Sequence, residues 1–365
     1  MGTSGNPLIF WFTGMLGDRL ADMITKSSSM PGLFDYENRM TELKAKETPL
    51  ERLDRVIEWE RFRGRLEEAV GKPSQGIGGR PRYDVVKMFK ILVAQRFYGL
   101  SDEQAELWVM DRLSFQKFVG LTLSDKVPDA NTIWDFREAI GQETLDQCFS
   151  DFWAYLKEQG IEAKAGKVVD ATFVEVPRQR NTREENAQIK EGKTPEDWRD
   201  DDAKLRQKDV DARWTKKGDE LHYGYKDHVK MDEASKLIQS YAVTHAAVHD
   251  SQMLDPLLSK DDVSIHADSA YRSEKIEALL KEKLIESRIC EKGGRNRPLT
   301  EEQKTSNRIK SKTRSRIEHV FGYVTNSMGD FCLECIGKAR VSKAVTLINL
   351  IYNMARYEQI VRLGR

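Results

Sequence analysis

The sequence KVVDATFVEV at residues 167–176 decides the fold of the larger part of the chain. It is rich in β-branched residues, which predicts a buried strand, and Asp170 interrupts its apolar run. Four further strands are predicted over 223–231, 237–244, 263–268 and 284–290, with helices over 251–258 and 273–283. The order predicts an α/β (α+β) fold, in which helices flank a mixed five-stranded sheet.

A polar segment at residues 177–221 interrupts this order between the first and second strands. It is rich in Arg, Lys, Asp and Glu and is too long for an ordinary loop, which predicts an insertion with helices of its own. Arg178 and Arg180 follow Asp170 closely. Two interpretations stay open for this segment: basic side chains that contact DNA, or a solvated excursion of the chain.

The N-terminal part has a different character. Apolar residues recur at helical spacing over 49–70 and 83–97, and a polar cap precedes an apolar stripe over 129–137. Short helices with interspersed Arg and Lys fit a DNA-reading helix-turn-helix, although a plain helical bundle is the simpler interpretation. We therefore expect two domains, a helical DNA-binding or multimerisation domain at 30–160 and a sheet domain at 161–365.

The first 29 residues look unlike the rest of the chain, and Met30 is a plausible alternative start. We expect residues 1–29 to be poorly ordered or to follow from a misassigned start codon. No apolar run approaches the ~18 residues of a membrane helix. The four cysteines are scattered, consistent with a reducing cytosol, and Cys332 and Cys335 have a zinc-ligand spacing without a second pair, which favours ordinary thiols.

Charge is balanced overall but not locally. The 59 Lys and Arg residues equal the 59 Asp and Glu residues, so there is no global attraction to nucleic acid. From Lys292 to Arg316, however, nine basic residues stand against two acidic ones. This run is either a phosphate-contacting surface or a solvated surface segment, and charge alone does not separate the two.

Three acidic residues suit metal-dependent phosphodiester chemistry. Asp170 and Asp268 are borne on strands, and Glu318 lies on a helix after the basic run. Two Mg²⁺ ions about 3.5–4 Å apart can flank one phosphate, and carboxylates are the ligands that Mg²⁺ prefers. Taken singly, each acid has a structural alternative, since a strand-end Asp commonly caps a turn and Glu318 can pair with Arg314 at i−4. His266, two residues before Asp268, either orients that carboxylate or packs, and packing is favoured.

Several motifs carry a resemblance to a known family. These are VDAT at 169–172, YGYKDH at 223–228, HDS at 249–251, HADSAY at 266–271 and RIEHVFG at 316–322. Together they resemble the DDE transposases of bacterial insertion sequences, specifically the insertion-sequence-5 family, from about Tyr83 to Tyr357. The family signature places a Tyr and an Arg before the glutamate and a Lys after it. Arg314 matches the Arg, whereas Ser311 and Thr325 replace the Tyr and the Lys.

The resemblance implies a ribonuclease-H-like core in which Asp170, Asp268 and Glu318 are the catalytic metal ligands. It implies Mg²⁺ as cofactor, two ions with Mn²⁺ as a substitute, and double-stranded DNA as partner, namely terminal inverted repeats and target DNA. A homo-oligomer on DNA in the bacterial cytoplasm, associated with the nucleoid, is expected. The expected DNA contacts are Arg178, Arg180, Arg308, Lys310, Lys312, Arg314 and Arg316. Two alternatives remain, a catalytically silent DNA-binding derivative and an endonuclease without strand transfer.

Overall fold

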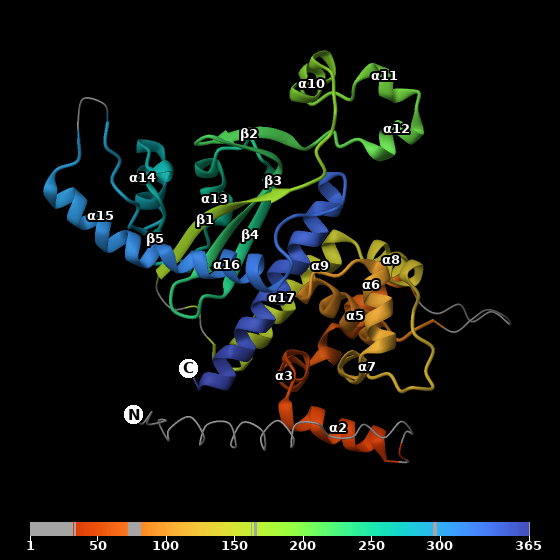
Figure 1. Ribbon diagram of the computed structural model, residues 1–365. Coiled ribbons are helices and arrows are strands. Elements are labelled where there is room, and N and C mark those ends of the chain that lie inside the picture. Colours follow the sequence, from red (N-terminus) through yellow and green to blue (C-terminus); the bar gives the residue numbers. More distant parts are fainter. Residues whose placement is uncertain are drawn as a thin grey trace, which may run out of the picture. The chain divides into compact units, whose positions relative to one another are not determined.

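The computed structural model describes residues 32, 34–71, 82–161, 163, 166–294 and 298–364, so the prediction for residues 1–29 lies outside the described residues. The chain divides into two compact units between Glu47 and Thr48. In the first unit, helix α2 spans Asp35–Lys46. The second unit holds all other elements in Figure 1. Among the described helices, none combines the length and apolar composition needed to cross a membrane.

The second unit begins with a group of helices. Their bounds are α3 Pro49–Val56, η1 Trp59–Phe62, α4 Arg63–Val70, α5 Val85–Phe97, α6 Asp102–Asp111, α7 Leu113–Val119, α8 Ala130–Ala139 and α9 Gln142–Glu158. Polar side chains fix where several of them start. Asp84 accepts the first free N–H groups of α5, Ser101 forms a capping box with Gln104, and Asp129 accepts the N–H of Thr132 in α8. The predicted helical character of this region is confirmed.

The sheet has six strands, namely β1 Gly166–Glu175, β2 Arg213–Lys217, β3 Glu220–Asp232, β4 Ile238–His245, β5 Ser264–His266 and β6 Glu286–Ser287. Along its main part the order is β4-β3-β1-β5-β6. The first three of these strands are antiparallel, and β5 and β6 run parallel to β1. This is the arrangement expected of a ribonuclease-H-like core, and the mixed α/β fold class is confirmed.

The sixth strand corrects the predicted count of five. It is β2, which lies inside the segment predicted as a polar insertion. Gly224 pairs with Glu175 at the end of β1 on one side and with Arg213 at the start of β2 on the other. Because β4 ends with His245 opposite Tyr225, β2 continues the edge of β3 that β4 leaves. Three short helices lie in the segment between β1 and β2. They are α10 Arg183–Lys190, α11 Glu196–Arg199 and α12 Asp202–Gln207. A strand of such polar composition forms because β3 extends beyond β4 and offers unpaired backbone groups.

Helices cover both faces of the sheet. On one face Val169 packs with buried residues of α13 (Leu254–Leu257), which follows η2 (Asp250–Met253), and of α14 (Glu274–Glu282). On the other face Val168 and Val174 join a larger core with α16 (Glu318–Ser327) and α17 (Lys338–Leu363). Neighbouring strand residues therefore serve opposite layers, as the pleat requires.

The long helix α17 lies between the sheet and the N-terminal helices (Figure 1). It is buried along most of its length, and the same core includes residues of α3 to α9. The compact unit therefore extends from Thr48 to Arg365 without a packing break near residue 160. The division into functional domains at 30–160 and 161–365 stays a prediction.

Candidate active site

Parallel pairing of β1 with β5 brings Asp170 and Asp268 together. The register pairs Gly166 with Ser264 and Val168 with His266. The same register, carried two residues further, sets Asp268 beside Asp170 on one face of the sheet. The negative charge of Asp268 is felt at Asp170 and raises its pKa, which agrees with close approach.

Asp170 lies in a mixed environment. Burial raises the pKa of its carboxyl, and the charge of Asp268 acts in the same direction. Two donors act against this effect: the N–H of Ala171 donates to Oδ1 over 2.9 Å, and Nη1 of Arg314 donates to Oδ2 over 3.2 Å. The net effect is a raised pKa of Asp170, so its surroundings do not fully stabilise the charged form of this carboxyl. A divalent cation would supply the missing positive charge.

Asp268 follows the last residue pair of β5 and caps the short helix η3 (Ser269–Tyr271). Its Oδ1 accepts the N–H of Ala270 over 2.7 Å, which fixes the carboxylate at the carboxyl end of the strand. The turn-capping function and a metal-binding function are therefore compatible, because only one oxygen is used by the cap. Two half-buried carboxylates with oxygen donors fit one Mg²⁺ together with water ligands.

Glu318 does not join this pair in the structure. It is exposed at the first position of α16, directly after η4 (Ser315–Ile317). Among the described residues, no three Asp, Glu, His or Cys side chains form a group able to hold a metal. The reason is local: helix α15 (Glu301–Arg314) ends with Arg314 against Asp170, and η4, anchored by the buried Ile317, then carries the chain onward.

His266 shares the strand face of Asp268, but its ring lies near Glu233 instead. Its ring is buried, and Nε2 lies 3.6 Å from Oε2 of Glu233. Neither ring nitrogen has a hydrogen-bond partner among the described residues. Burial lowers the pKa of His266, and the charge of Glu233 opposes that effect. The neutral, packed ring agrees with the favoured sequence interpretation.

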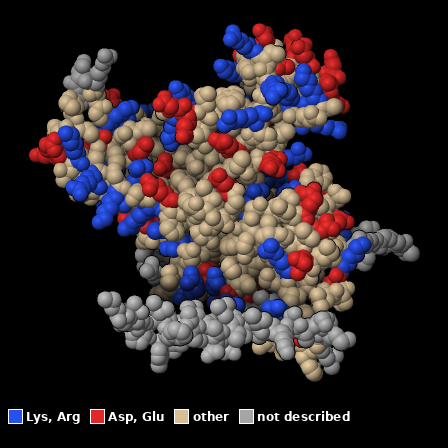
Figure 2. All heavy atoms as spheres, in the orientation of Figure 1, with Lys and Arg blue, Asp and Glu red and all other residues tan. Residues whose placement is uncertain are grey.

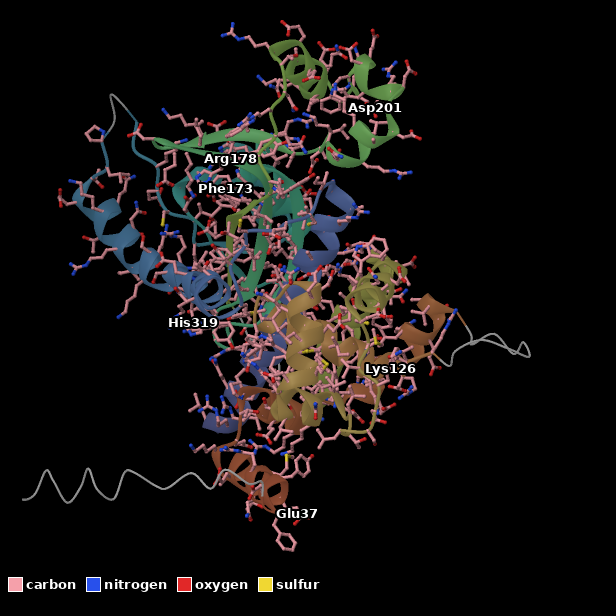
Figure 3. All side chains as sticks on the ribbon, turned by 45° about the vertical axis from the view of Figure 1, so that its right-hand side comes forward. Glu37, Lys126, Phe173, Arg178, Asp201 and His319 are labelled. Atoms are coloured by element: carbon pink, nitrogen blue, oxygen red, sulfur yellow. The ribbon has the colours of Figure 1, made fainter. Side chains whose placement is uncertain are left out.

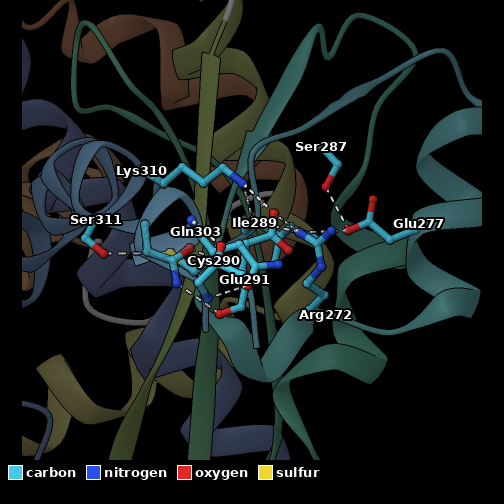
Figure 4. A network of polar contacts seen from close by, with 11 residues as sticks. Arg272, Glu277, Ser287, Ile289, Cys290, Glu291, Gln303, Lys310 and Ser311 are labelled. Atoms are coloured by element: carbon cyan, nitrogen blue, oxygen red, sulfur yellow. Dashed lines mark hydrogen bonds and ion pairs between the residues drawn. The ribbon is translucent and has the colours of Figure 1, made fainter. Parts of the chain in front are cut away.

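The basic residues of α15 and η4 divide between two faces. Lys310 and Arg314, one turn apart, turn toward the sheet, where Nζ of Lys310 donates to the carbonyl of Ile289 over 3.0 Å and lies 3.2 Å from Glu291. Arg272 also reaches Glu291, over 3.1 Å, in the network shown in Figure 4. Exposed cations of these elements include Arg308 and Lys312 on α15 and Arg316 on η4, where Nη1 of Arg316 also lies 3.3 Å from Oε1 of Glu233. Figure 2 shows Lys and Arg side chains gathered over this helix.

Comparisons with known proteins decide the family. A model described as "Transposase domain (DUF772)" matches residues 38–139, and one described as "Transposase DDE domain" matches residues 163–354, more than half of the chain. The chain belongs to the DDE transposases. Among solved structures it is similar to a piggyBac transposase synaptic complex with hairpin DNA, at 12% identity and a TM-score of 0.43, over 87% of this chain and 76% of that one.

The transposase has two further predicted basic residues at the base of its insertion. Arg178 and Arg180 are exposed in the segment between β1 and α10. The guanidinium of Arg178 lies 5.7 Å from the ring centre of Trp214, and Figure 3 shows Arg178 beyond Phe173 at the end of the sheet. The carbonyl oxygen of Arg180 accepts a hydrogen bond from Lys208 over 2.8 Å, which ties this segment to the end of α12. The side chains of Arg178 and Arg180 are therefore exposed to solvent, and they lie far from α15 in the sequence.

The structure adds residues near the aspartates that sequence reasoning gave no function. Nζ of Lys226 donates to Oδ1 of Asp250 over 2.7 Å and to the carbonyl of Val248 over 2.9 Å. Tyr271, three residues after Asp268, is buried beside them, because η2 and η3 pack together. All three side chains belong to motifs that carry the family resemblance, YGYKDH, HDS and HADSAY. Their position in these motifs is the sequence signal that could have identified the three residues.

Proposed function

We propose that this protein is the transposase of a bacterial insertion sequence of the insertion-sequence-5 type. It binds the terminal inverted repeats of its element as a homo-oligomer on nucleoid DNA in the bacterial cytoplasm, cuts the DNA strands and joins them to target DNA. The observation that carries the proposal is the pair Asp170 and Asp268, set side by side by the register of β1 and β5, with Arg314 against it. Membership of the DDE transposases supports the reaction class.

In this proposal Asp170 and Asp268 hold Mg²⁺, and Mn²⁺ substitutes for it. Bound metal, two ions in the complete site, supplies an activated nucleophile and stabilises the leaving oxygen of the phosphodiester. Arg314 orients the carboxylate of Asp170 in the free protein. On bound DNA a phosphate would compete for Arg314, and Glu318 would be the third residue to hold the metal. The proposal is supported by the position of Glu318, which is four residues after Arg314 and directly follows η4.

The proposed DNA path follows the outer face of α15. Arg308 and Lys312 are exposed there and Arg316 follows on η4, and cations spaced by four residues suit contacts with successive phosphates. Arg178 and Arg180 extend the path at the insertion. The helical segment 30–160 is proposed to recognise the repeat sequence or to hold protomers together. Lys310 and Arg314, which bond within the protein, contribute to the site itself rather than to the outer surface.

The test uses DNA that carries the inverted repeats flanking the gene. We expect Asp170→Asn, Asp268→Asn and Glu318→Gln each to abolish Mg²⁺-dependent cleavage and to leave binding to the repeats nearly unchanged. Asp255→Asn is the matched control, because Asp255 is an exposed acid that pairs with Lys283 outside the site. Wild-type cleavage by any of the three site variants would remove that residue from the assignment.

The same reactions separate the two alternatives. Joined products with short target duplications are expected for a transposase, whereas an endonuclease releases ends and joins none. A catalytically silent derivative would bind the repeats without cutting them in either Mg²⁺ or Mn²⁺. The presence of both strand-borne aspartates at one site favours catalysis, since a binding role alone does not require them.

A further inference from the structure

Tyr271 is a buried tyrosine whose hydroxyl forms no hydrogen bond with the described residues. It is 1% exposed and packs in the cluster that includes Val169 and Ala267, which directly precede Asp170 and Asp268. Among the described residues its hydroxyl oxygen has no hydrogen-bond partner. A buried hydroxyl without a partner destabilises a protein, and phenylalanine would fill the same space without that penalty. The missing partner is therefore something that the protein binds.

The charges of three aspartates act on this hydroxyl. Burial, and after it the charges of Asp170, Asp250 and Asp268, raise the pKa of Tyr271 well above its ordinary value. The phenol consequently stays protonated and is available as a donor. The position is fixed from two sides, since Tyr271 ends the short helix capped by Asp268, and η2, which begins with Asp250, packs against that helix.

Each carboxylate near Tyr271 already has a donor of its own. Lys226 donates to Asp250, Arg314 donates to Asp170, and the N–H of Ala270 donates to Asp268. None of these carboxylates therefore depends on the Tyr271 hydroxyl for a hydrogen bond. A neutral donor at this point also has a particular use: it can orient an oxygen ligand of a cation without adding a positive charge that would repel the cation.

We propose that Tyr271 is a positioning residue whose hydroxyl donates a hydrogen bond to a water held by a divalent cation on Asp170 and Asp268. This inference rests on the proposed function, because it requires a cation at the two aspartates. It also gives a purpose to the bond between Lys226 and Asp250. That bond joins β3 to η2, and η2 in turn holds η3 with Tyr271 in place.

The test compares the full-length wild type with Tyr271→Phe and a matched control, Tyr352→Phe. Tyr352 is equally buried at 1% exposure, but its hydroxyl donates to the carbonyl of Lys236 over 2.9 Å. Thermal unfolding is measured in EDTA, and Mn²⁺ binding is measured by titration without DNA. In EDTA we expect Tyr271→Phe to match or exceed the wild-type melting temperature, and Tyr352→Phe to melt lower. Mn²⁺ binding should weaken roughly tenfold or more in Tyr271→Phe only.

Two results would overturn the inference. A melting temperature in EDTA that falls for Tyr271→Phe as it does for Tyr352→Phe would mean that the hydroxyl has a partner within the protein. Unchanged Mn²⁺ affinity in Tyr271→Phe would mean that the hydroxyl does not act on the cation. Asp170→Asn separates this failure from failure of the proposed function. If Asp170→Asn loses Mn²⁺ while Tyr271→Phe keeps it, only Tyr271 is misassigned; if Asp170→Asn also keeps it, the proposed metal site itself is wrong.

Discussion

Replacing Asp227 by Asn is expected to stabilise the protein at neutral and alkaline pH and to change little in acid. Asp227 lies in the middle of β3 and is fully buried. Its Oδ2 accepts a hydrogen bond from Nδ2 of Asn349 in α17 over 3.0 Å. Its Oδ1 and Oδ1 of Asn349 both lack partners among the described residues. One proton between the two side chains would satisfy both oxygens, and the introduced amide would supply it permanently.

The magnitude follows from the pKa of Asp227. Burial raises this pKa from 3.8 to about 7, and the hydrogen bond from Asn349 only partly opposes the rise. Because the folded-state pKa is above the unfolded one, the stabilisation by the bound proton is complete below about pH 4. It is lost as the pH rises through 7. A shift of about three units corresponds to roughly 4 kcal/mol at alkaline pH, as an upper value. The amide of the variant avoids this loss because it does not ionise.

The assay is denaturant unfolding of wild type and Asp227→Asn at a series of pH values from about 4 to 9. The difference between the two free energies of unfolding isolates Asp227 from other titrating groups. It should be near zero at the acid end and grow to a few kcal/mol in favour of the variant. A variant that is less stable than the wild type at every pH would refute the reasoning, since Asp227 would then be a carboxylate with a partner that Asn cannot replace.

A second buried aspartate, Asp262, provides a control for which the same substitution is expected to lower the stability instead of raising it. Asp262 pairs with Lys230 over 2.8 Å, and both side chains are almost completely buried. Asp262→Asn leaves the ammonium of Lys230 without its counter-charge, which is expected to destabilise the protein by about 3–5 kcal/mol near neutral pH. The contrast tests whether the local partner, an amide or an ammonium, decides the effect of the same substitution.

The remaining predictions concern the DNA surface and one backbone contact. Changing both Arg308 and Lys312 to Gln should weaken DNA binding and reduce the slope of log affinity against log salt by about one per cation. Lys310→Gln should leave that slope unchanged, because Lys310 bonds within the protein, and the reverse pattern in binding titrations would place the DNA elsewhere. Gly99→Ala should lower the free energy of unfolding by about 1–3 kcal/mol, because φ is +62° and a Cβ would lie 2.7 Å from Cα of Gly329. A melting temperature equal to wild type would contradict this last prediction.

Local sequence patterns predicted most elements because their causes are local. The β-branched run at 167–176 and the hairpin at 223–244 form strands with nearly the predicted bounds. The strand predicted at 284–290 is reduced to Glu286–Ser287, since it pairs with only a short part of β5 at the edge of the sheet. The polar strand β2 was missed, because it forms only where β3 offers it unpaired backbone groups.

The candidate site was predictable in residue type but not in geometry. Helical spacing alone separates Arg308 and Lys312 from Lys310 and Arg314, since residues four apart share a face. It does not say which pair faces the sheet, and only the packing of α15 decides that Lys310 reaches Glu291 and Arg314 reaches Asp170. The exposed position of Glu318 likewise depends on the helical break at η4, for which the sequence carries no Gly or Pro signal.

The sequence by itself determined that this chain builds a mixed sheet with flanking helices and carries motifs that resemble those of DDE transposases, because strand propensity, helix caps and motif residues act over a few neighbours. Only the tertiary structure decided that Asp170 and Asp268 lie side by side and that Glu318 stands apart from them. It alone also decided that the buried hydroxyl of Tyr271, on which their charges act, has no hydrogen-bond partner within the described part of the chain. These facts depend on strand register and helix packing between segments far apart in the chain, where a shift of one residue turns each side chain to the other face.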